Sequence, residues 1–316
     1  MKLLVSDLEG YKSYISREFF FVMTDLMTKY GWRQIDPWRL WDGSKTIKNQ
    51  LLNEFGELPE AILFWESFDL VSEKAGQIRR LECNKYIFSD DLHWWDEEMR
   101  KAKLTSFALC NTVLSTYGYT WKDYYPEIST KRVEWVPHSA SPDFMLPYNP
   151  QPKNSIFLSG AITIHYPLRQ QMKLLQETQC YPIVHHCHPG YHSQYDYDND
   201  KDVGRGYAEL INKHRAGFTD SLIYKYVVAK YFEIPATGTL LLADDRVSAP
   251  LSKLGLMENS HYLPVSGDNL EERIRYVLDE DNHPELDEIR RRGQELIWEK
   301  HKTSDRARQI NEVCRV

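Results

Sequence analysis

The sequence has no apolar run that approaches the roughly 18 residues of a membrane span, and its opening, MKLLVSDLEG, turns acidic at Asp7. Its five cysteines are scattered and odd in number, and none of them forms a C-x-x-C pair. This usage fits a reducing compartment better than a disulfide scaffold. We therefore expect a cytoplasmic protein without a transmembrane segment.

Positive charge is also scarce. The chain of 316 residues has 39 Lys and Arg against 46 Asp and Glu, a formal net charge of −7. A dedicated nucleic-acid binder needs Lys and Arg gathered on one face to neutralise phosphates. We therefore expect no nucleic-acid partner.

Several catalytic motifs are missing. Neither G-x-S-x-G nor H-E-x-x-H occurs, which argues against a Ser or Cys nucleophile. The lone G-x-G, Gly204 to Gly206, lacks a third glycine and does not follow a strand-like run. A nicotinamide dehydrogenase is therefore disfavoured.

Two segments resemble metal sites. HHCHPGYH (185–192) could supply zinc ligands, but Pro189 and Gly190 interrupt it, and histidines at a strand end that line a polar crevice explain it better. DYDND (196–200) contains D-x-D but fails as a calcium loop, and a solvated acidic loop is the simpler interpretation. We expect no metal and no cofactor.

Strand-like and helical patterns alternate along the chain, which predicts an α/β fold of parallel βαβ units. Five prolines between residues 137 and 152 indicate a linker, after which the alternation restarts. We therefore predict two doubly wound, Rossmann-like domains, with a ligand crevice at the carboxyl ends of their strands. The predicted strands cover 2–7, 60–67, 84–91, 131–139, 155–162, 181–187, 216–221 and 239–244.

Two strand-to-helix junctions of the second domain carry cations. Arg169 lies at the start of a predicted helix over 167–178, where an anion is favoured and an arginine can bind phosphate bidentately. A second junction leads into a predicted helix over 224–234, with Lys225, Lys230 and Glu233. A surface arginine would explain Arg169 equally well, but the two junctions together favour an anion site.

Several segments resemble GT-B glycosyltransferases, most closely glycosyltransferase family 4 and the spore-maturation-type enzymes. FTDSLIYKYVVAKYFEIPATGTLLLADD (218–245) is similar to their donor-site segment, and EWVPHSASPDF (134–144) to their interdomain linker. FSDDLHWW (88–95) resembles a loop of their first domain that presents a histidine to the sugar. GQELIWEKHKTSDRARQI (293–310) is similar to their final helix, which crosses back to that domain.

This resemblance implies an acceptor-binding domain over 1–145, a donor-binding domain over 153–300, and a terminal helix over 301–316 that packs on the first domain. It implies that Glu233 binds the ribose hydroxyls of a nucleoside diphosphate sugar, of UDP or GDP type. Family 4 enzymes usually carry a second Glu where this chain has Lys225, which leaves retention of configuration open. The implied catalytic residues are His93, Asp91, Arg169 and Lys225, and the implied donor-binding residues are Gly160, Tyr166, Arg169, His188, Lys230, Glu233, Gly238 and Thr239.

The sequence thus predicts a metal-independent, retaining glycosyltransferase that acts on a carbohydrate or glycoconjugate acceptor and forms at most a weak homodimer. A nucleotide-sugar epimerase of the same architecture, a non-catalytic carbohydrate-binding protein and a zinc hydrolase centred on the histidines remain alternatives. Pro235 and Gly238 are expected to end the helix of Glu233 beside the crevice.

Overall fold

The structure, a computed structural model, describes residues 1–41, 43–191 and 194–315, and it divides into two compact units. The amino-terminal unit comprises Met1–Lys12, Phe19–Pro137 and Ser304–Val316; the carboxyl-terminal unit comprises Ser13–Glu18 and His138–Thr303. A short early segment of the chain therefore belongs to the second unit, and the last helix belongs mainly to the first.

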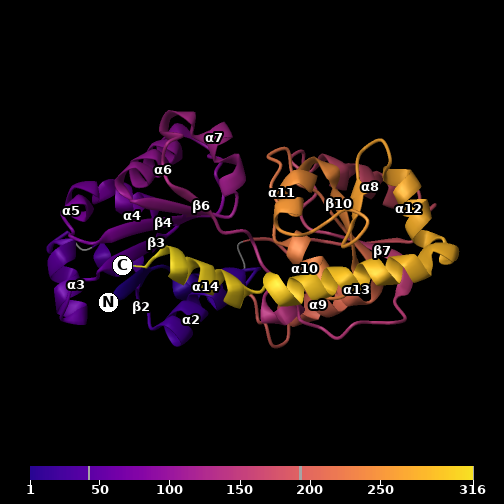
Figure 1. Cartoon of the computed structure of the whole chain (residues 1–316), viewed down its shortest axis with the longest axis horizontal. Coiled ribbons are helices and arrows are strands. Elements are labelled where there is room, and N and C mark those ends of the chain that lie inside the picture. Colours follow the sequence, from indigo (N-terminus) through magenta and orange to yellow (C-terminus); the bar gives the residue numbers. More distant parts are fainter. Residues whose placement is uncertain (42, 192–193, 316) are drawn as a thin grey trace. The chain divides into compact units, whose positions relative to one another are not determined.

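The described strands of the amino-terminal unit form a parallel sheet in the order β2-β1-β3-β4-β5-β6 (Figure 1). They are β1 (Lys2–Val5), β2 (Arg33–Ile35), β3 (Ala61–Trp65), β4 (Asn84–Ser89), β5 (Thr112–Ser115) and β6 (Val133–Trp135). β1 and β3 are almost continuous apolar runs, because helices cover both faces of the sheet.

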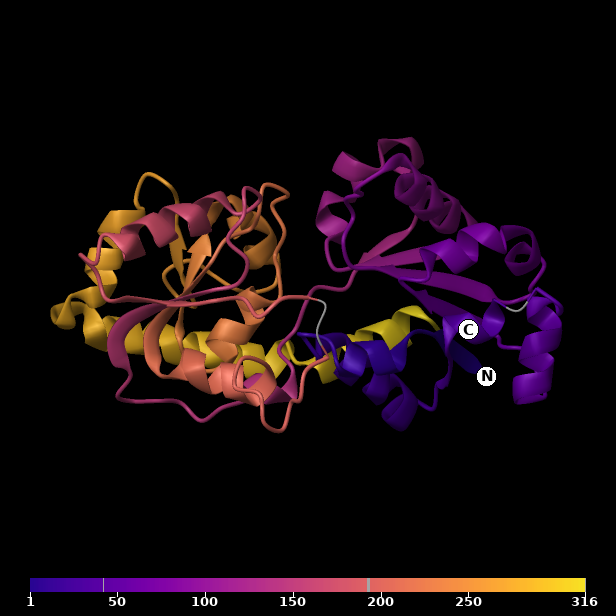
Figure 2. The same ribbon diagram turned by 180° about the vertical axis from the view of Figure 1, so that it is seen from behind.

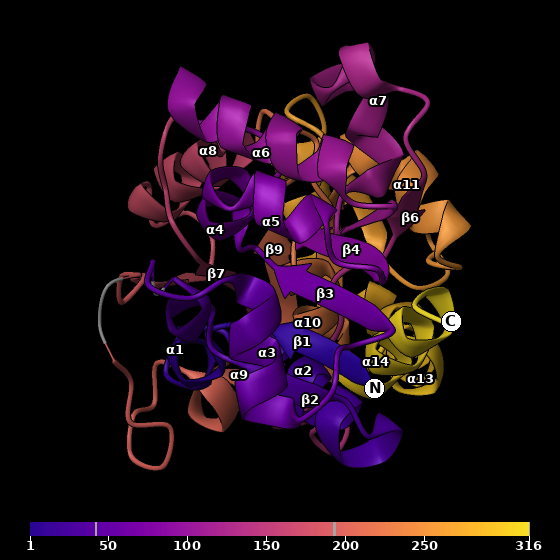
Figure 3. The ribbon, with the colours of Figure 1, turned by 90° about the vertical axis from the view of Figure 1, so that its left-hand side faces the viewer.

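Figure 3 shows α4, α5 and α6 over one face of this sheet and α2 and α14 beneath the other. Met23 and Leu26 of α2 are buried together with Ala307 and Ile310 of α14 and with strand residues. The terminal helix thus packs on the first domain, as expected. The helices are α1 (Leu8–Lys12), α2 (Glu18–Tyr30), α3 (Ile47–Phe55), α4 (Phe68–Glu73), α5 (Ala75–Arg79), α6 (Glu97–Leu109), α7 (Trp121–Tyr124) and α14 (Thr303–Val313).

The carboxyl-terminal unit is built on a second parallel sheet, in the order β11-β10-β9-β7-β8. Its strands are β7 (Lys153–Ser159), β8 (Ile183–His186), β9 (His214–Thr219), β10 (Leu240–Asp244) and β11 (Leu263–Val265). Because β7 lies between β8 and β9, the loops that follow these three strands leave the sheet at neighbouring points.

Helices cover both faces of this sheet as well: α9, α10 and α13 lie along one face (Figure 2), and α8 and α12 along the other. These helices are α8 (Pro167–Glu177), α9 (Gly204–Asn212), α10 (Lys230–Ala236), α11 (Ser248–Lys253), α12 (Leu270–Leu278) and α13 (His283–Lys300). Short 3-10 helices lie at Pro37–Leu40, Gly118–Thr120, Pro126–Ile128, Pro142–Phe144, Asp245–Val247 and Glu280–Asn282. No helix within the described ranges is long and apolar enough to cross a membrane.

Each predicted strand overlaps an observed one, and β2, β5 and β11 were not predicted. The helix predicted over 224–234 is wrong in its first half, since α10 begins only at Lys230. Leu222 and Lys225 have φ angles of 59° and 56°, and this left-handed backbone cannot continue a right-handed helix. Pro235 lies inside α10 and does not end it.

Candidate functional site

Charged side chains of the carboxyl-terminal unit converge just beyond the end of β7. Gly160 follows this strand with a φ of 96°, a left-handed conformation that glycine adopts without steric cost. A Cβ atom here would lie 2.7 Å from Nη1 of Arg169 and 3.0 Å from Cε of Lys230. The absence of a side chain therefore lets two cations approach the same stretch of backbone. This place lies at the carboxyl ends of the strands, where parallel α/β domains bind ligands.

Arg169 lies in the first turn of α8, and only 2% of its surface is exposed. Its Nη1 donates to the carbonyl oxygen of Ala161 at 3.2 Å, and its Nη2 donates to the hydroxyl of Thr219 at 3.1 Å. The guanidinium carbon lies 4.0 Å from the centre of the Tyr166 ring. The loops after β7 and β9 therefore fix this cation in place, which is the preorganisation that charge stabilisation requires.

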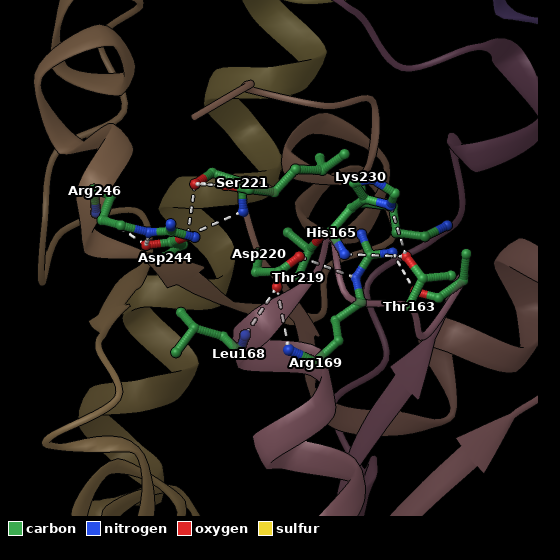
Figure 4. Close-up of polar contacts among 12 residues, drawn as sticks. Thr163, His165, Leu168, Arg169, Thr219, Asp220, Ser221, Lys230, Asp244 and Arg246 are labelled. Atoms are coloured by element: carbon green, nitrogen blue, oxygen red, sulfur yellow. Dashed lines mark hydrogen bonds and ion pairs between the residues drawn. The ribbon is translucent and has the colours of Figure 1, made fainter. Parts of the chain in front are cut away.

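Asp220, directly after β9, binds the start of α8 (Figure 4). Its Oδ2 accepts hydrogen bonds from the backbone N–H groups of Leu168 at 3.1 Å and Arg169 at 3.2 Å. Its Oδ1 lies 3.4 Å from Nε of Arg169. Burial raises the pKa of Asp220, and the Arg169 charge opposes that rise.

The expectation that this helix start binds an external anion therefore needs correction. A carboxylate of the chain itself already accepts from two of the N–H groups that would hold a phosphate. The reason is topological, because β9 lies beside β7 and delivers Asp220 to the beginning of α8. An anion in this place must be held mainly by side chains.

Lys230, the first residue of α10, is the second cation. Its Nζ donates to Oη of Tyr207 at 3.0 Å, lies 4.9 Å from the centre of the Tyr207 ring, and lies 3.9 Å from Oε2 of Glu233. Burial lowers the pKa of Lys230, but the neighbouring Tyr207 and Glu233 more than compensate, so that the net pKa is raised. Lys230 is therefore charged at neutral pH.

Glu233 lies one turn further along α10, and only 6% of its surface is exposed. In the described part of the chain its carboxylate accepts no hydrogen bond, and its ion-pair partner is the Lys230 ammonium. Burial raises the pKa of Glu233, with the Glu18 and Asp143 charges adding to the rise and the Lys230 and His138 charges opposing it. A buried carboxylate with free acceptor capacity is suited to bind a hydroxyl-rich ligand.

The early segment Ser13–Glu18 contributes to the surroundings of Glu233. Glu18 Oε2 lies 2.8 Å from Nδ1 of His138, and Oε1 accepts from the Ser139 hydroxyl at 2.8 Å. Arg17 binds Asp143 through a bidentate pair, with Nη2 at 2.8 and 2.9 Å from the two carboxylate oxygens. Sequence reasoning missed these residues, because each pairs with a partner more than a hundred positions away and no local pattern marks it.

His188 lies beside the same two cations. Its Nδ1 accepts from the backbone N–H of Gly190 at 3.0 Å. Burial, with the positive charges of Lys230 and Arg169, lowers the pKa of His188 to about 4. The ring is therefore neutral at physiological pH and offers hydrogen bonds, not charge.

The other histidines of this segment do not assemble a metal site. His186 lies 3.5 Å from Asp202, and His192 lies outside the described residues. Over 1–41, 43–191 and 194–315, no three His, Cys, Asp or Glu side chains are placed to hold one metal ion. Asp196 of the D-x-D segment is exposed and accepts from the backbone N–H of Asp198 at 3.1 Å, so it closes its own turn.

Three of the residues implied by the resemblance lie elsewhere in the carboxyl-terminal unit. Gly238 and Thr239 lie at the amino end of β10, opposite the edge that bears Gly160, because α10 runs antiparallel to the strands. The Gly238 carbonyl accepts from Arg290, and the Thr239 hydroxyl donates to the Ile211 carbonyl. Lys225 is exposed in the turn before α10, so the helix does not carry it. Helix α10 thus ends before Gly238, at the end away from the cation pair, contrary to the expectation.

In the amino-terminal unit, the predicted residues His93 and Asp91 lie beyond the end of β4. His93 Nδ1 is 3.8 Å from Oδ1 of Asp91, and Lys103 donates to the backbone carbonyl oxygens of both residues. The half-buried Glu66, directly after β3, accepts from the backbone N–H of Asp90 at 2.9 Å. Burial, together with the Asp90 charge, raises the pKa of Glu66 to about 7. Sequence reasoning missed Glu66, which lies near the end of the strand predicted over 60–67 and is marked by no local pattern.

Comparison with known proteins finds glycosyltransferases among the similar proteins. Residues 170–312 match the family model described as "Glycosyl transferase-like". An alpha-glucosyltransferase in complex with UDP-glucose and DNA has a TM-score of 0.63 at 11% identity and covers 99% of this chain and 98% of its own. Anabaena HepE in complex with UDP-glucose has a TM-score of 0.61 at 10% identity, with 99% of both chains covered. T4 phage beta-glucosyltransferase has a TM-score of 0.55 at 10% identity, with 100% of both chains covered.

These matches confirm the predicted GT-B fold of two Rossmann-like domains, and residues 170–312 are similar to the glycosyl transferase-like family. No curated protein sequence matches the chain. The assignment to glycosyltransferase family 4 stays a prediction.

Proposed function

We propose that this protein transfers a sugar from a nucleoside diphosphate sugar to an acceptor hydroxyl. The observation that carries the proposal is Glu233, a nearly buried carboxylate without a hydrogen-bond donor in the described chain, beside Arg169 and Lys230 at the carboxyl edge of a parallel sheet. The Glu233 carboxylate can accept hydrogen bonds from the two ribose hydroxyls of such a nucleotide sugar, and the two cations can bind its diphosphate.

Each residue has a distinct part in this proposal. Glu233 accepts hydrogen bonds from the ribose hydroxyls, while Arg169 and Lys230 bind the diphosphate. As the bond between the anomeric carbon and the phosphate oxygen breaks, the bond to the acceptor oxygen forms and negative charge grows on the leaving group. Two fixed cations stabilise that charge in the transition state. We propose that this leaves no need for a metal ion and that configuration is retained.

The acceptor is assigned to the amino-terminal unit. His93, Asp91 and Glu66 lie at the carboxyl ends of β3 and β4, the edge where such a sheet presents polar groups to a ligand. The acceptor hydroxyl loses its proton as it attacks, and a carboxylate with a pKa near 7, such as Glu66, can accept that proton.

Substrate classes follow from chemistry and from the structural neighbours. HepE and the alpha-glucosyltransferase were solved with UDP-glucose, so we propose a UDP-type donor. The alpha-glucosyltransferase complex also contains DNA, so the fold is compatible with such an acceptor. We propose a carbohydrate or glycoconjugate acceptor, because the net charge of −7 opposes DNA binding. We also propose that the protein works in the cytoplasm.

A thermal-shift panel tests the donor assignment. UDP, GDP, ADP and CDP forms of common sugars are added to the purified protein, and the true donor raises Tm because it binds only the folded state. Release of nucleoside diphosphate is then measured with and without candidate acceptors. Release that depends on an acceptor supports transfer, whereas interconversion of donor sugars without an acceptor would establish an epimerase. A panel without any nucleotide response would overturn the proposal.

A further inference from the structure

Two side chains of the carboxyl-terminal unit that the function above does not use form a hydrogen-bonded chain with Lys230. Ser159, the last residue of β7, has its Oγ 2.5 Å from Oη of Tyr207 on α9. The same Oη accepts from Nζ of Lys230 at 3.0 Å. The Lys230 ammonium also lies 4.9 Å from the centre of the Tyr207 ring. A strand end and the starts of two helices are thus linked through one phenol.

Chemistry fixes the direction of donation at one end of this chain. An ammonium group only donates, so the Tyr207 oxygen accepts from Lys230. In the described part of the chain, Ser159 is the one acceptor within reach of the Tyr207 proton. Either hydroxyl of this pair can donate to the other. When Tyr207 donates to Ser159, its oxygen accepts from Lys230 alone, and the hydroxyl proton of Ser159 then has no acceptor among the described residues.

The position of this free proton indicates what it binds. Ser159 has 3% of its surface exposed and directly precedes Gly160, which both Arg169 and Lys230 approach. A hydroxyl of this kind needs an acceptor to offset its burial. Beside two cations, the favoured acceptor is an oxyanion, because an ionised acceptor forms the stronger hydrogen bond.

We propose that the Ser159 hydroxyl donates to a phosphate oxygen of the ligand, and that Tyr207 is the positioning residue that turns this proton toward the ligand. The proposal rests on the proposed function, since it takes the anion to be the diphosphate of the donor. It assigns Tyr207 no contact with the ligand. Tyr207 acts by accepting from Lys230 and by donating to Ser159.

A double-mutant cycle tests the proposal. Binding of inorganic pyrophosphate and of UDP is measured by calorimetry for Ser159→Ala, Tyr207→Phe and the double variant. Each single variant is expected to bind both ligands about 5- to 20-fold more weakly. The double variant is expected to bind within about twofold of the weaker single variant, because Tyr207 acts only by orienting the proton that Ser159→Ala removes. A purely structural role for Tyr207 would give additive losses.

Matched controls come from the same unit. Ser155→Ala removes a hydroxyl from β7 that lies 2.7 Å from His214, and Tyr148→Phe removes a phenol oxygen next to Asp287. Both are expected to bind pyrophosphate like the unaltered protein. If Tyr207→Phe does not fold, the affinities of Ser159→Ala and Ser155→Ala for pyrophosphate can still be compared. That comparison decides whether the Ser159 hydroxyl binds the anion.

The outcomes separate this inference from the proposed function. If the unaltered protein binds UDP and the variants bind it equally well, only the roles of Ser159 and Tyr207 are overturned. The same holds if the variants lose affinity additively. An unaltered protein that binds neither UDP nor pyrophosphate nor another nucleoside diphosphate overturns the proposed function and this inference together.

Discussion

Glu233 carries an energetic cost in the protein without ligand. Its carboxylate is buried, accepts no hydrogen bond within the described residues, and has a raised pKa because burial disfavours its charged form. Local charges do not remove this cost, since Glu18 and Asp143 add to the rise in pKa. Groups that are kept in such surroundings concentrate at binding and catalytic sites.

Glu233→Gln should separate binding from stability. The substitution removes a buried charge, so we expect the free energy of unfolding to rise at neutral pH. It also replaces one acceptor oxygen by a donor, so binding of UDP-glucose should weaken by about 1 to 3 kcal/mol. Urea unfolding and calorimetry measure the two effects. Glu209→Gln, at an exposed site on α9, serves as control. Unchanged donor affinity in a folded Glu233→Gln protein would remove Glu233 from the site.

Glu66 makes the stability of the amino-terminal unit depend on pH. Its pKa is raised from 4.5 to about 7 in the folded protein, so between these values the folded chain holds a proton that the unfolded chain has released. The folded state binds more protons in this window, and stability therefore falls as pH rises through it. Above about pH 7 the destabilisation is complete.

Glu66→Gln should remove this dependence. Glutamine keeps an oxygen that can accept from the Asp90 N–H group but does not ionise. We expect the variant to be more stable than the unaltered protein by about 1 to 3 kcal/mol near pH 8 and nearly equal to it near pH 4.5. Urea unfolding at both pH values measures the difference, with the exposed Glu57→Gln as control. An equal difference at the two pH values would contradict the assignment.

At the scale of elements, α8 is held by a carboxylate from the neighbouring strand end. Asp220 caps two N–H groups of the helix and pairs with the Arg169 guanidinium, while both residues are almost fully buried. Removal of one partner of a buried ion pair leaves an uncompensated charge, which costs about 3 to 5 kcal/mol. Arg169 is therefore structural as well as a candidate ligand contact.

The variants Arg169→Ala and Arg169→Ala/Asp220→Asn divide these two roles. The single variant should unfold at least about 2 kcal/mol more easily, because Asp220 is left charged and buried. The double variant should recover part of that loss, since asparagine has no charge and its oxygen can still cap α8. Both variants should bind the donor more weakly than the unaltered protein does. Urea unfolding and calorimetry test both statements, and recovery of binding in the double variant would show that Arg169 acts only through Asp220.

The sequence was informative where the signal is local. Apolar runs located the central strands, and the junctions after β7 and β9 drew attention to Arg169, Lys230 and Glu233, which lie close together in the structure. The roles of Tyr207 and Asp220 depend on strand order, which no local pattern specifies. Lys225 was placed on a helix because its neighbours fit a helical period, whereas two left-handed residues end that period before α10 begins.

At the scale of the whole molecule, the two units divide the chemistry. The cations, Glu233 and the Ser159 chain belong to the carboxyl-terminal unit together with the segment Ser13–Glu18, whereas His93 and Glu66 belong to the amino-terminal unit. Nucleotide binding should therefore stabilise one unit first, and its effect should map onto residues that are distant in sequence but belong to that unit.

Hydrogen exchange with and without UDP tests this division. At a UDP concentration about 100 times Kd, binding stabilises the folded state by about 2.7 kcal/mol. We expect slower exchange in α9, α10 and the start of α8, and also in residues 13–18, whose Glu18 lies close enough to Glu233 to raise its pKa. Helix α3, in the other unit, is the internal reference and should not change. Glu233→Gln at the same UDP concentration should show less protection because it binds more weakly. Protection confined to α3 and its neighbours would place the nucleotide in the amino-terminal unit and contradict the assignment.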